Sequence, residues 1–389
     1  MNNHTPELGE HEVLERASSQ LMGHLPLPSE GYRCTPQTLW HMILGATVNR
    51  CTLETVGQDL TEAPSGAAVR GHLQAQLSAD DLPYLERQMN RAVAAEIPAQ
   101  LSDQPQAVAI DFHDQAYYGK TEQAQGLWVQ GEAQAGTTRF YRVATAYVIR
   151  RKRRLTLAIC FVLPEDAAAG ILTALLERLK SLKIKIKTLY LDRGCASLAV
   201  IRCLRQWQQP TVIACPIRGK QGGTRALCQG PASYRTQHTF RNPELGEETV
   251  DVAVCRVFTT AKRTGRAARR ADWMVFIVLQ LDWPPKQIRQ AYRRRFGIES
   301  SYRCARQVRG WTTSPNPAYR FLLIALSFFL LNVWSQLRWQ WAQVPRRGHR
   351  ALNEAHFRLG RLAKFIRRAL ETLYGCVHQI EALADRPIP

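Results

Sequence analysis

The sequence has no C-x-x-C pair, no disulfide framework and no apolar segment at its N-terminus. Its ten cysteines are scattered over 389 residues, unlike the dense pattern of small disulfide-stapled secreted domains. Their spacing, as for Cys195 and Cys203, does not match a zinc site either. Residues 1–10 are polar, so no secretory signal peptide is predicted. We therefore expect reduced thiols in the core of a cytosolic protein.

Long apolar runs are also missing, apart from one stretch at residues 321–334. This run includes Ser327 and Asn332 and is closely flanked by Arg320 and Arg338. Because a membrane-spanning helix needs about 20 apolar residues, the run favours a helix buried in a protein core. The alternative is a basic, membrane-associated protein built around this segment, which membrane fractionation would reveal.

Acidic residues are few, since 32 Asp and Glu stand against 52 Lys and Arg and leave a net charge of +20. Such an excess favours a polyanionic partner, either nucleic acid or an anionic membrane surface. The simpler alternative is that the charge only aids solubility. With 45% hydrophobic and 22% charged residues, the chain has the composition of a folded protein and not of a disordered one.

The N-terminal part shows helical periodicity. The third and fourth predicted helices are separated by a short turn and have helix-turn-helix proportions, with Thr52 and Ser65 as N-caps. Whether this unit reads DNA or is an ordinary helical hairpin stays open. The predicted helices cover residues 12–25, 36–49, 53–60, 67–77 and 82–95.

From residue 105 onward the pattern changes to strands and then to alternating helices and strands. Residues 140–149 and 155–163 are separated by the basic run Arg150 to Arg154, which predicts an antiparallel hairpin with a positive tip. The order β-β-β-α-β-α-β predicts a mixed sheet with helices on both faces, which is the order of the ribonuclease-H-like fold. The strands are expected at 106–114, 140–149, 155–163, 187–192 and 211–217, and the helices at 167–182 and 197–207.

Residues 218–272 interrupt this alternation and are rich in Gly, Arg and Thr. We interpret them, together with a strand at 273–279, as a β-rich insertion whose basic run at 262–270 forms a loop. From residue 285 the chain is predicted to be helical almost to its end. The resulting division is a helical DNA-binding or dimerisation region at 1–104, a first core part at 105–217, the insertion at 218–284, a second core part at 285–345 and a C-terminal helical region at 346–389.

Three carboxylates stand out. Asp111 and Asp192 each follow an apolar strand, at the end where open α/β sheets place their sites, although such residues are also common turn formers. The third, Glu299, lies in a helix predicted over 291–309. At 100° per residue it shares one helix face with several basic residues and a tyrosine. That face, with three arginines for one acid, suits contact with phosphates. Its members are Tyr292, Arg295, Glu299, Arg303 and Arg306.

Four of these residues fit the pattern Y-x2-R-x3-E-x6-K, with Arg306 in the Lys position. This pattern resembles the signature of DDE transposases of bacterial and archaeal insertion sequences. The resemblance covers about residues 106–340 and places Asp111 on the first core strand and Asp192 after the fourth, as in that family. Arg306 keeps the charge of the usual lysine but changes its geometry.

The resemblance implies a ribonuclease-H-like, integrase-type core and a DNA transposase that nicks and joins insertion-sequence ends. Asp111, Asp192 and Glu299 would then be the catalytic residues and the ligands of two Mg²⁺ ions, with Mn²⁺ as a substitute. It also implies double-stranded DNA with terminal inverted repeats and target DNA as partners, a homodimer on DNA, no membrane, and a cytoplasmic, nucleoid-associated location in a prokaryote. The expected DNA-binding residues are Tyr292, Arg295, Arg303 and Arg306, together with Trp273, which by its location could stack a flipped base.

Two other functions are compatible with the same sequence pattern. The protein could be an inactive or domesticated DNA-binding protein, which a metal-dependent nicking assay would distinguish. It could also be a non-transposing, metal-dependent nuclease, which would cut DNA but fail to join ends to a target. Near Asp111, the sequence offers His113 as a possible neighbour of the metal or as a structural residue.

Overall fold

The computed structural model describes most of the chain, and its contacts divide the chain into two compact units. The helical unit comprises residues 1–96, 118–127 and 303–389, and the α/β unit comprises residues 97–117 and 128–302. Each unit is described by itself. The described residues are 6–29, 32–120, 126–150, 153–219, 223–263, 266–344 and 351–380, without the side chains of 259–263 and 266–270.

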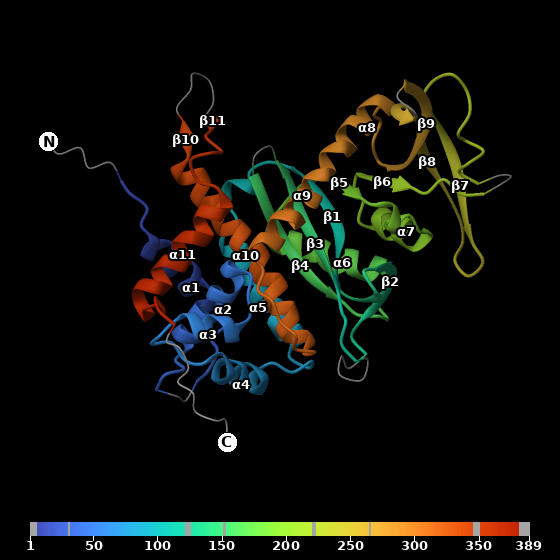
Figure 1. Cartoon of the computed structure of the whole chain (residues 1–389). Helices are drawn as coiled ribbons and strands as arrows, with labels where there is room; N and C mark the ends of the chain where they lie inside the picture. The colour runs from blue at the N-terminus through green and yellow to red at the C-terminus, as the bar shows by residue number, and fades with distance from the viewer. Residues whose placement is uncertain are drawn as a thin grey trace. The chain divides into compact units, whose positions relative to one another are not determined.

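The helical unit contains the five N-terminal helices in the predicted order, and helices from the C-terminal part complete it (Figure 1). A short strand pair, β10 with β11, follows α10, so the prediction of helix almost to the end was wrong there. The elements are α1 (Glu10–His24), α2 (Pro36–Asn49), α3 (Leu53–Asp59), α4 (Gly66–Gln76), α5 (Leu82–Ala95), α10 (Pro317–Trp341), β10 (Gln343–Val344), β11 (Ala351–Leu352) and α11 (Leu359–Tyr374).

Helix α10 contains the apolar run that imitates a membrane span. Among the described residues it is the one helix whose length and hydropathy would allow it to cross a membrane, and its most apolar 18-residue window is completely buried within the fold. Asn332 in this helix donates a hydrogen bond to the backbone carbonyl of Val93 on α5. The prediction of a helix buried in a protein core is therefore confirmed by the packing.

Helices α3 and α4 form the predicted helix–turn–helix hairpin, and their caps are those expected. Thr52 accepts a hydrogen bond from the backbone N–H of Thr55, and Ser65 accepts one from Ala68. The two helices cross closely at Gly66, where an added methyl group would lie 2.4 Å from the Cα of Glu54. Glycine is therefore required at this crossing for steric reasons.

Replacing Gly66 by alanine should destabilise the helical unit, because a methyl group there collides with the backbone of α3. We expect a loss of about 1–3 kcal/mol or more in the free energy of unfolding. Gly71→Ala on the same helix is the matched control, because no atom lies within 4 Å of the added methyl group, and it should stabilise the protein by up to about 1 kcal/mol. Thermal melting of the two variants measures the difference, and equal melting temperatures would contradict this account.

The α/β unit is built on one large mixed sheet with the strand order β2-β3-β1-β5-β6-β9-β8-β7, and β4 pairs with β3. Its helices α6 and α7 pack against each other. The elements are β1 (Gln106–Ala116), β2 (Val129–Gln134), β3 (Thr137–Arg150), β4 (Arg153–Val162), α6 (Ala168–Ser181), β5 (Ile186–Leu191), α7 (Leu198–Gln206), β6 (Thr211–Cys215), β7 (Tyr234–Asn242), β8 (Gly246–Arg263), β9 (Arg266–Leu279), α8 (Pro285–Arg293) and α9 (Gly297–Ala305).

All predicted core strands are present, and β2 is an additional strand that pairs with β3. Strands β3 and β4 form the predicted antiparallel hairpin, whose tip includes residues 151–152 outside the described range. The β-rich segment does not stand apart from the core, because β9 pairs antiparallel with β6 and extends the same sheet. The basic run at 262–270 is not the loop that we predicted, since β8 and β9 stay paired as far as Arg263 and Arg266.

The two faces of β1 have different surroundings. Ile110 and Phe112 face the apolar core, which also contains residues of α6 and α7. Because successive side chains of a strand alternate between faces, Asp111 and His113 point to the opposite face. There the ring of His113 stacks on Tyr302 of α9, with ring centroids 4.8 Å apart. The apolar residues of β1 thus anchor the strand and direct Asp111 toward α9.

Candidate active site

Asp111 and Asp192 lie on two neighbouring parallel strands, Asp111 in the middle of β1 and Asp192 directly after the end of β5. Strand β1 pairs with β5, and the last parallel pair joins Ile110 to Leu191. Each aspartate is the next residue along the chain, so the two side chains emerge where β1 and β5 stop pairing, while β1 continues beside β3 as far as Ala116. Open α/β sheets place their sites where parallel pairing ends in this way. The two aspartates are 81 positions apart in the sequence, yet they are neighbours in space.

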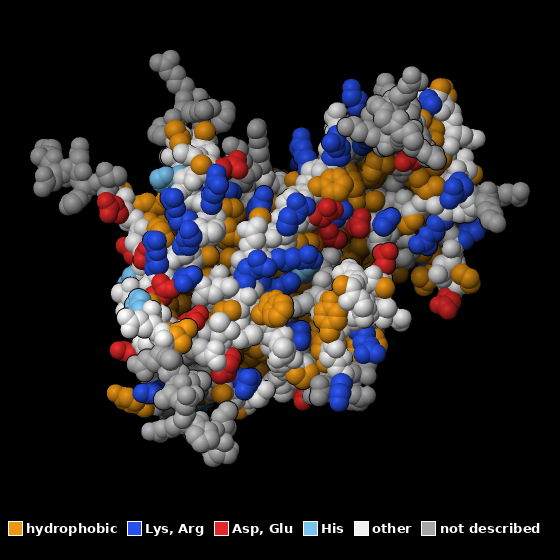
Figure 2. Space-filling model, in the orientation of Figure 1, with side chains coloured by type: hydrophobic (Ala, Val, Ile, Leu, Met, Phe, Trp, Pro, Cys, Tyr) orange, Lys and Arg blue, Asp and Glu red, His pale blue; other side chains and the backbone are white. Residues whose placement is uncertain are grey.

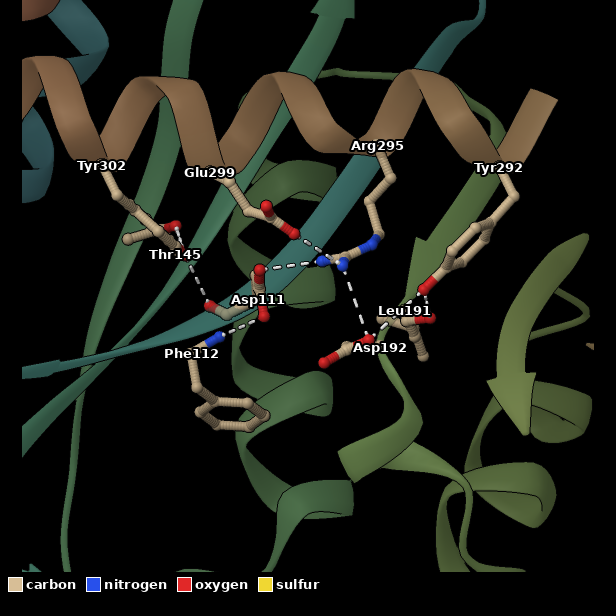
Figure 3. Close-up of polar contacts among 9 residues, drawn as sticks. All are labelled: Asp111, Phe112, Thr145, Leu191, Asp192, Tyr292, Arg295, Glu299 and Tyr302. Carbon is tan, nitrogen blue, oxygen red and sulfur yellow. Dashed lines mark hydrogen bonds and ion pairs between the residues drawn. The ribbon is translucent and has the colours of Figure 1, made fainter. Parts of the chain in front are cut away.

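Glu299 reaches the same place from a helical segment that crosses above the sheet ends. This segment consists of α8, a 3-10 turn at Arg294–Phe296, α9 and a second 3-10 turn at Arg306–Val308. The sequence predicted one uninterrupted α-helix over 291–309, so that prediction was wrong in detail. Tyr292, Arg295 and Glu299 nevertheless point to the same side, toward the aspartates (Figure 3).

The guanidinium group of Arg295 contacts all three carboxylates (Figure 3). Its Nη1 donates to Asp111 at 2.8 Å, and its Nη2 lies 3.5 Å from Asp192 and 3.2 Å from Glu299. The Arg295 side chain is 5% exposed, whereas those of Asp192 and Glu299 are 41% and 46% exposed. Arg295 was predicted to face DNA phosphates, but in this structure it is buried among the acids.

Two tyrosines, Tyr292 and Tyr302, hold the backbone of the site through hydrogen bonds. The sequence had not predicted contacts between these tyrosines and the aspartates. Tyr292 is buried and donates to the carbonyl of Leu191 and to Asp192, at 3.2 and 3.4 Å. Tyr302 donates to the carbonyl of Asp111 at 3.0 Å and shares a 2.7 Å hydrogen bond with Thr145. The buried position of Tyr292 does not fit the predicted contact with DNA. Tyr302 lies three residues after Glu299, and this helical spacing was the available signal for it.

Asp111 is the most buried of the three carboxylates, with 14% of its side chain exposed. Burial, together with the nearby Asp192 carboxylate, raises the pKa of Asp111 to about 6, although Arg295 favours the ionised form. Near pH 6 the carboxyl group is therefore poised between its two protonation states in the absence of a metal. An added cation would favour the ionised form.

The donor set at this site fits a divalent cation such as Mg²⁺. Its ligands are oxygen atoms, and protein sites usually bind Mg²⁺ through one or two carboxylates together with substrate phosphates. Among the described residues, no group of three His, Cys, Asp or Glu side chains could hold one ion together. Two carboxylates are nevertheless enough to bind one Mg²⁺ ion. Asp192 and Glu299 form such a pair, because both lie within 3.5 Å of the same nitrogen atom of Arg295 and are therefore close to each other.

The other predicted site residues lie elsewhere. Arg303 and Arg306 are exposed and belong to the helical unit, so their predicted contact with DNA stays a prediction. Trp273 lies on β9 and packs, partly buried, against the apolar core. His113 is buried against Tyr302, which agrees with a structural role.

In Figure 2, a small group of acidic side chains lies beside α9 with Lys and Arg side chains around it.

Comparison with known proteins identifies the fold. No protein-family model matches the chain, and the sequence of no curated protein matches it significantly. Among solved structures, the chain resembles piggyBac transposase in a synaptic complex with hairpin DNA, with a TM-score of 0.54 and 10% sequence identity. The match covers 94% of this chain and 77% of that one. The chain therefore has a mixed α/β fold similar to that of a transposase.

Proposed function

We propose that this protein is a DNA transposase that uses a DDE site to cut and join the ends of an insertion sequence. The observation that carries the proposal is the convergence of Asp111, Asp192 and Glu299 from β1, β5 and α9 on one guanidinium group. The similar fold of piggyBac transposase, seen in a complex with hairpin DNA, supports DNA as the partner. The net charge of +20 supports a polyanionic partner independently.

The core is proposed to be ribonuclease-H-like. Reading across the sheet, the order β4-β3-β1-β5-β6 has the first strand in the centre. On one side β3 runs antiparallel to β1 and β4 antiparallel to β3, and on the other side β5 and β6 run parallel to β1. This is the strand order expected for that fold. Strands β7, β8 and β9 would then be the family's β-rich insertion, placed here as an extension of the sheet.

In this proposal Asp111, Asp192 and Glu299 hold two Mg²⁺ ions, which Mn²⁺ can replace. Two such ions provide a nucleophile and stabilise the leaving oxygen in an in-line displacement at phosphorus. The protein itself fixes the three carboxylates. Tyr302 and Thr145 hold the backbone at Asp111, while Tyr292 orients Asp192. The more exposed Asp192 and Glu299 face the side from which a phosphodiester would approach.

The helical unit is proposed to bind the element ends, a second copy of the chain, or both. Helix α4 presents Arg70 and Gln74, one turn apart, on its exposed side, and both side-chain types pair with base edges in the major groove. We further propose that the partners are terminal inverted repeats and target DNA, that the protein acts as a homodimer on DNA, and that it works in the prokaryotic cytoplasm at the nucleoid.

The test is a joining assay with the purified full chain and DNA from the flanks of its gene. With Mg²⁺ or Mn²⁺ present, we expect nicks at the element ends and joined products on a target plasmid. A fragment with scrambled ends and a reaction containing a chelator are the controls. Cleavage without joining would favour a nuclease, and binding without cleavage would favour an inactive DNA-binding protein. Either result would overturn the transposase proposal.

A further inference from the structure

Arg295 sits where a divalent cation would have to act on the carboxylates. It comes from the same helical segment as Glu299, yet it lies 184 positions from Asp111 in the sequence. Its two terminal nitrogens contact oxygen atoms of all three acids within 3.5 Å. A surface ladder of i,i+4 pairs would join Arg295 to Glu299 only. The guanidinium is instead the shared counter-ion of three acids from three different elements.

The oxygen atoms that accept from Arg295 belong to the same three carboxylates that are proposed to hold the metal. In Asp111, one oxygen accepts from Arg295 and the other accepts from the backbone N–H of Phe112 at 3.0 Å. A cation and a guanidinium cannot occupy the same space beside these oxygens. Repulsion between the positive charges adds to this steric conflict. Metal binding and the observed position of Arg295 therefore oppose each other.

The surroundings of Arg295 also leave it incompletely satisfied. Its Nε is buried and has no hydrogen-bond partner among the described residues, which is costly for a charged group. Its guanidinium lies over the rings of Tyr292 and Phe296, at 5.4 and 5.7 Å from their centroids. Phe296 is 47% exposed, whereas Arg295 itself is 4% exposed, so the guanidinium reaches solvent only when its side chain moves. A phosphate group could pair with the guanidinium in bidentate fashion.

We infer that Arg295 is a built-in counter-ion that competes with divalent cations for the carboxylates of Asp111, Asp192 and Glu299, and that a DNA phosphate relieves this competition. The inference rests on the proposed function and deepens it. It makes Arg295 a positioning residue that keeps the metal-free site folded and weakens metal binding in the absence of DNA. By linkage, DNA must then strengthen metal binding as much as the metal strengthens DNA binding through this site.

The experiment measures Mn²⁺ binding to the full chain without DNA, by electron paramagnetic resonance. We expect Arg295→Gln to bind Mn²⁺ about tenfold more tightly than the unaltered protein, because the competitor is gone. Arg294→Gln is the matched control: it removes the same charge from the adjacent, exposed position, and it should change the affinity little. Arg295→Lys keeps the charge without the planar fork and should give an intermediate affinity.

A second measurement keeps the inference testable if Arg295→Gln folds poorly without metal. Without Mn²⁺, the melting temperature of Arg295→Gln should be lower than that of the unaltered protein, because the three acids then repel each other. Adding Mn²⁺ should raise the melting temperature of Arg295→Gln by more than it raises that of the unaltered protein. Adding DNA should tighten Mn²⁺ binding in the unaltered protein and much less in Arg295→Gln.

Unchanged or weaker Mn²⁺ binding in Arg295→Gln would overturn the inference, since a purely structural arginine predicts weaker binding. Absence of binding in both proteins would overturn it as well. The joining assay on the same preparation separates the two ideas. If the unaltered protein joins DNA ends while Arg295→Gln fails the binding test, only the counter-ion role is lost. If no joining occurs in any metal, the proposed function fails.

Discussion

Asp111→Asn, Asp192→Asn and Glu299→Gln should each lower DNA cleavage and joining about a thousandfold or more, while DNA binding is largely retained. Each change removes one negative oxygen ligand from a site where the cation supplies several kcal/mol of transition-state stabilisation. Because each 1.36 kcal/mol corresponds to a factor of ten in rate, the loss of about 4 kcal/mol gives this effect. Single-turnover cleavage of end fragments and a gel-shift assay measure the two properties.

Asp114→Asn is the matched control for this series. Asp114 lies on β1, three residues after Asp111, so alternation places it on the opposite face of the strand. It forms an ion pair with Arg142 at 2.6 Å instead of contacting Arg295, and this pair is partly exposed, so its loss should cost at most about 1 kcal/mol. Near-normal turnover in one of the three test variants would remove that residue from the catalytic set. An equal loss in Asp114→Asn would show that the assay reports folding and not chemistry.

The sequence predicted the positions of the aspartates well because both follow apolar strands. A buried strand needs a continuous apolar run, and such a run precedes each aspartate. Asp192 directly follows the end of β5, whereas β1 continues past Asp111 to Ala116. The parallel pairing of those strands also follows from the element order. Two antiparallel pairings, β1 with β3 and β3 with β4, make β4 parallel to β1, and the crossover helix α6 returns the chain to β5 in the direction of β4. Local patterns were sufficient for this part of the site.

The partner of Arg295 could not be predicted in the same way. A helical wheel shows which residues share a face, but not what that face contacts. Counting charges on the helix alone gave three arginines for one acid and suggested a phosphate-binding face. The structure adds Asp111 and Asp192 from the sheet, so the surplus charge of Arg295 is balanced by residues more than 100 positions away.

The basic run at 262–270 shows a different limit of sequence patterns. Its many Arg and Lys residues resemble a solvated loop, and charge repulsion disfavours close packing. Backbone pairing in an antiparallel hairpin does not require burial, however, and β8 and β9 continue their ladder through this region. The run of charge therefore predicted solvent exposure, while it contained no information about whether the backbone was paired.

DNA binding by this protein should weaken steeply with salt. Each Lys or Arg that neutralises a phosphate on B-DNA contributes about 0.9 to the slope of log affinity against log salt concentration. The contribution of Arg303 and Arg306 to this slope tests their predicted contacts with DNA, because both side chains are exposed and can reach a phosphate. The double variant Arg303→Gln/Arg306→Gln should reduce the slope by about 1.8 and weaken binding to every DNA sequence alike.

Arg241→Gln provides the control for that measurement. Arg241 is exposed but forms an ion pair with Glu247 at 3.1 Å, so its charge is already balanced and its removal should leave the slope nearly unchanged. Fluorescence anisotropy over a range of salt concentrations gives all three slopes. A flat response in the unaltered protein would show that phosphate neutralisation does not drive binding, and the net charge of +20 would then serve solubility. A steep response that the double variant leaves intact would instead place the phosphate contacts on other basic residues and remove Arg303 and Arg306 from the DNA-binding set.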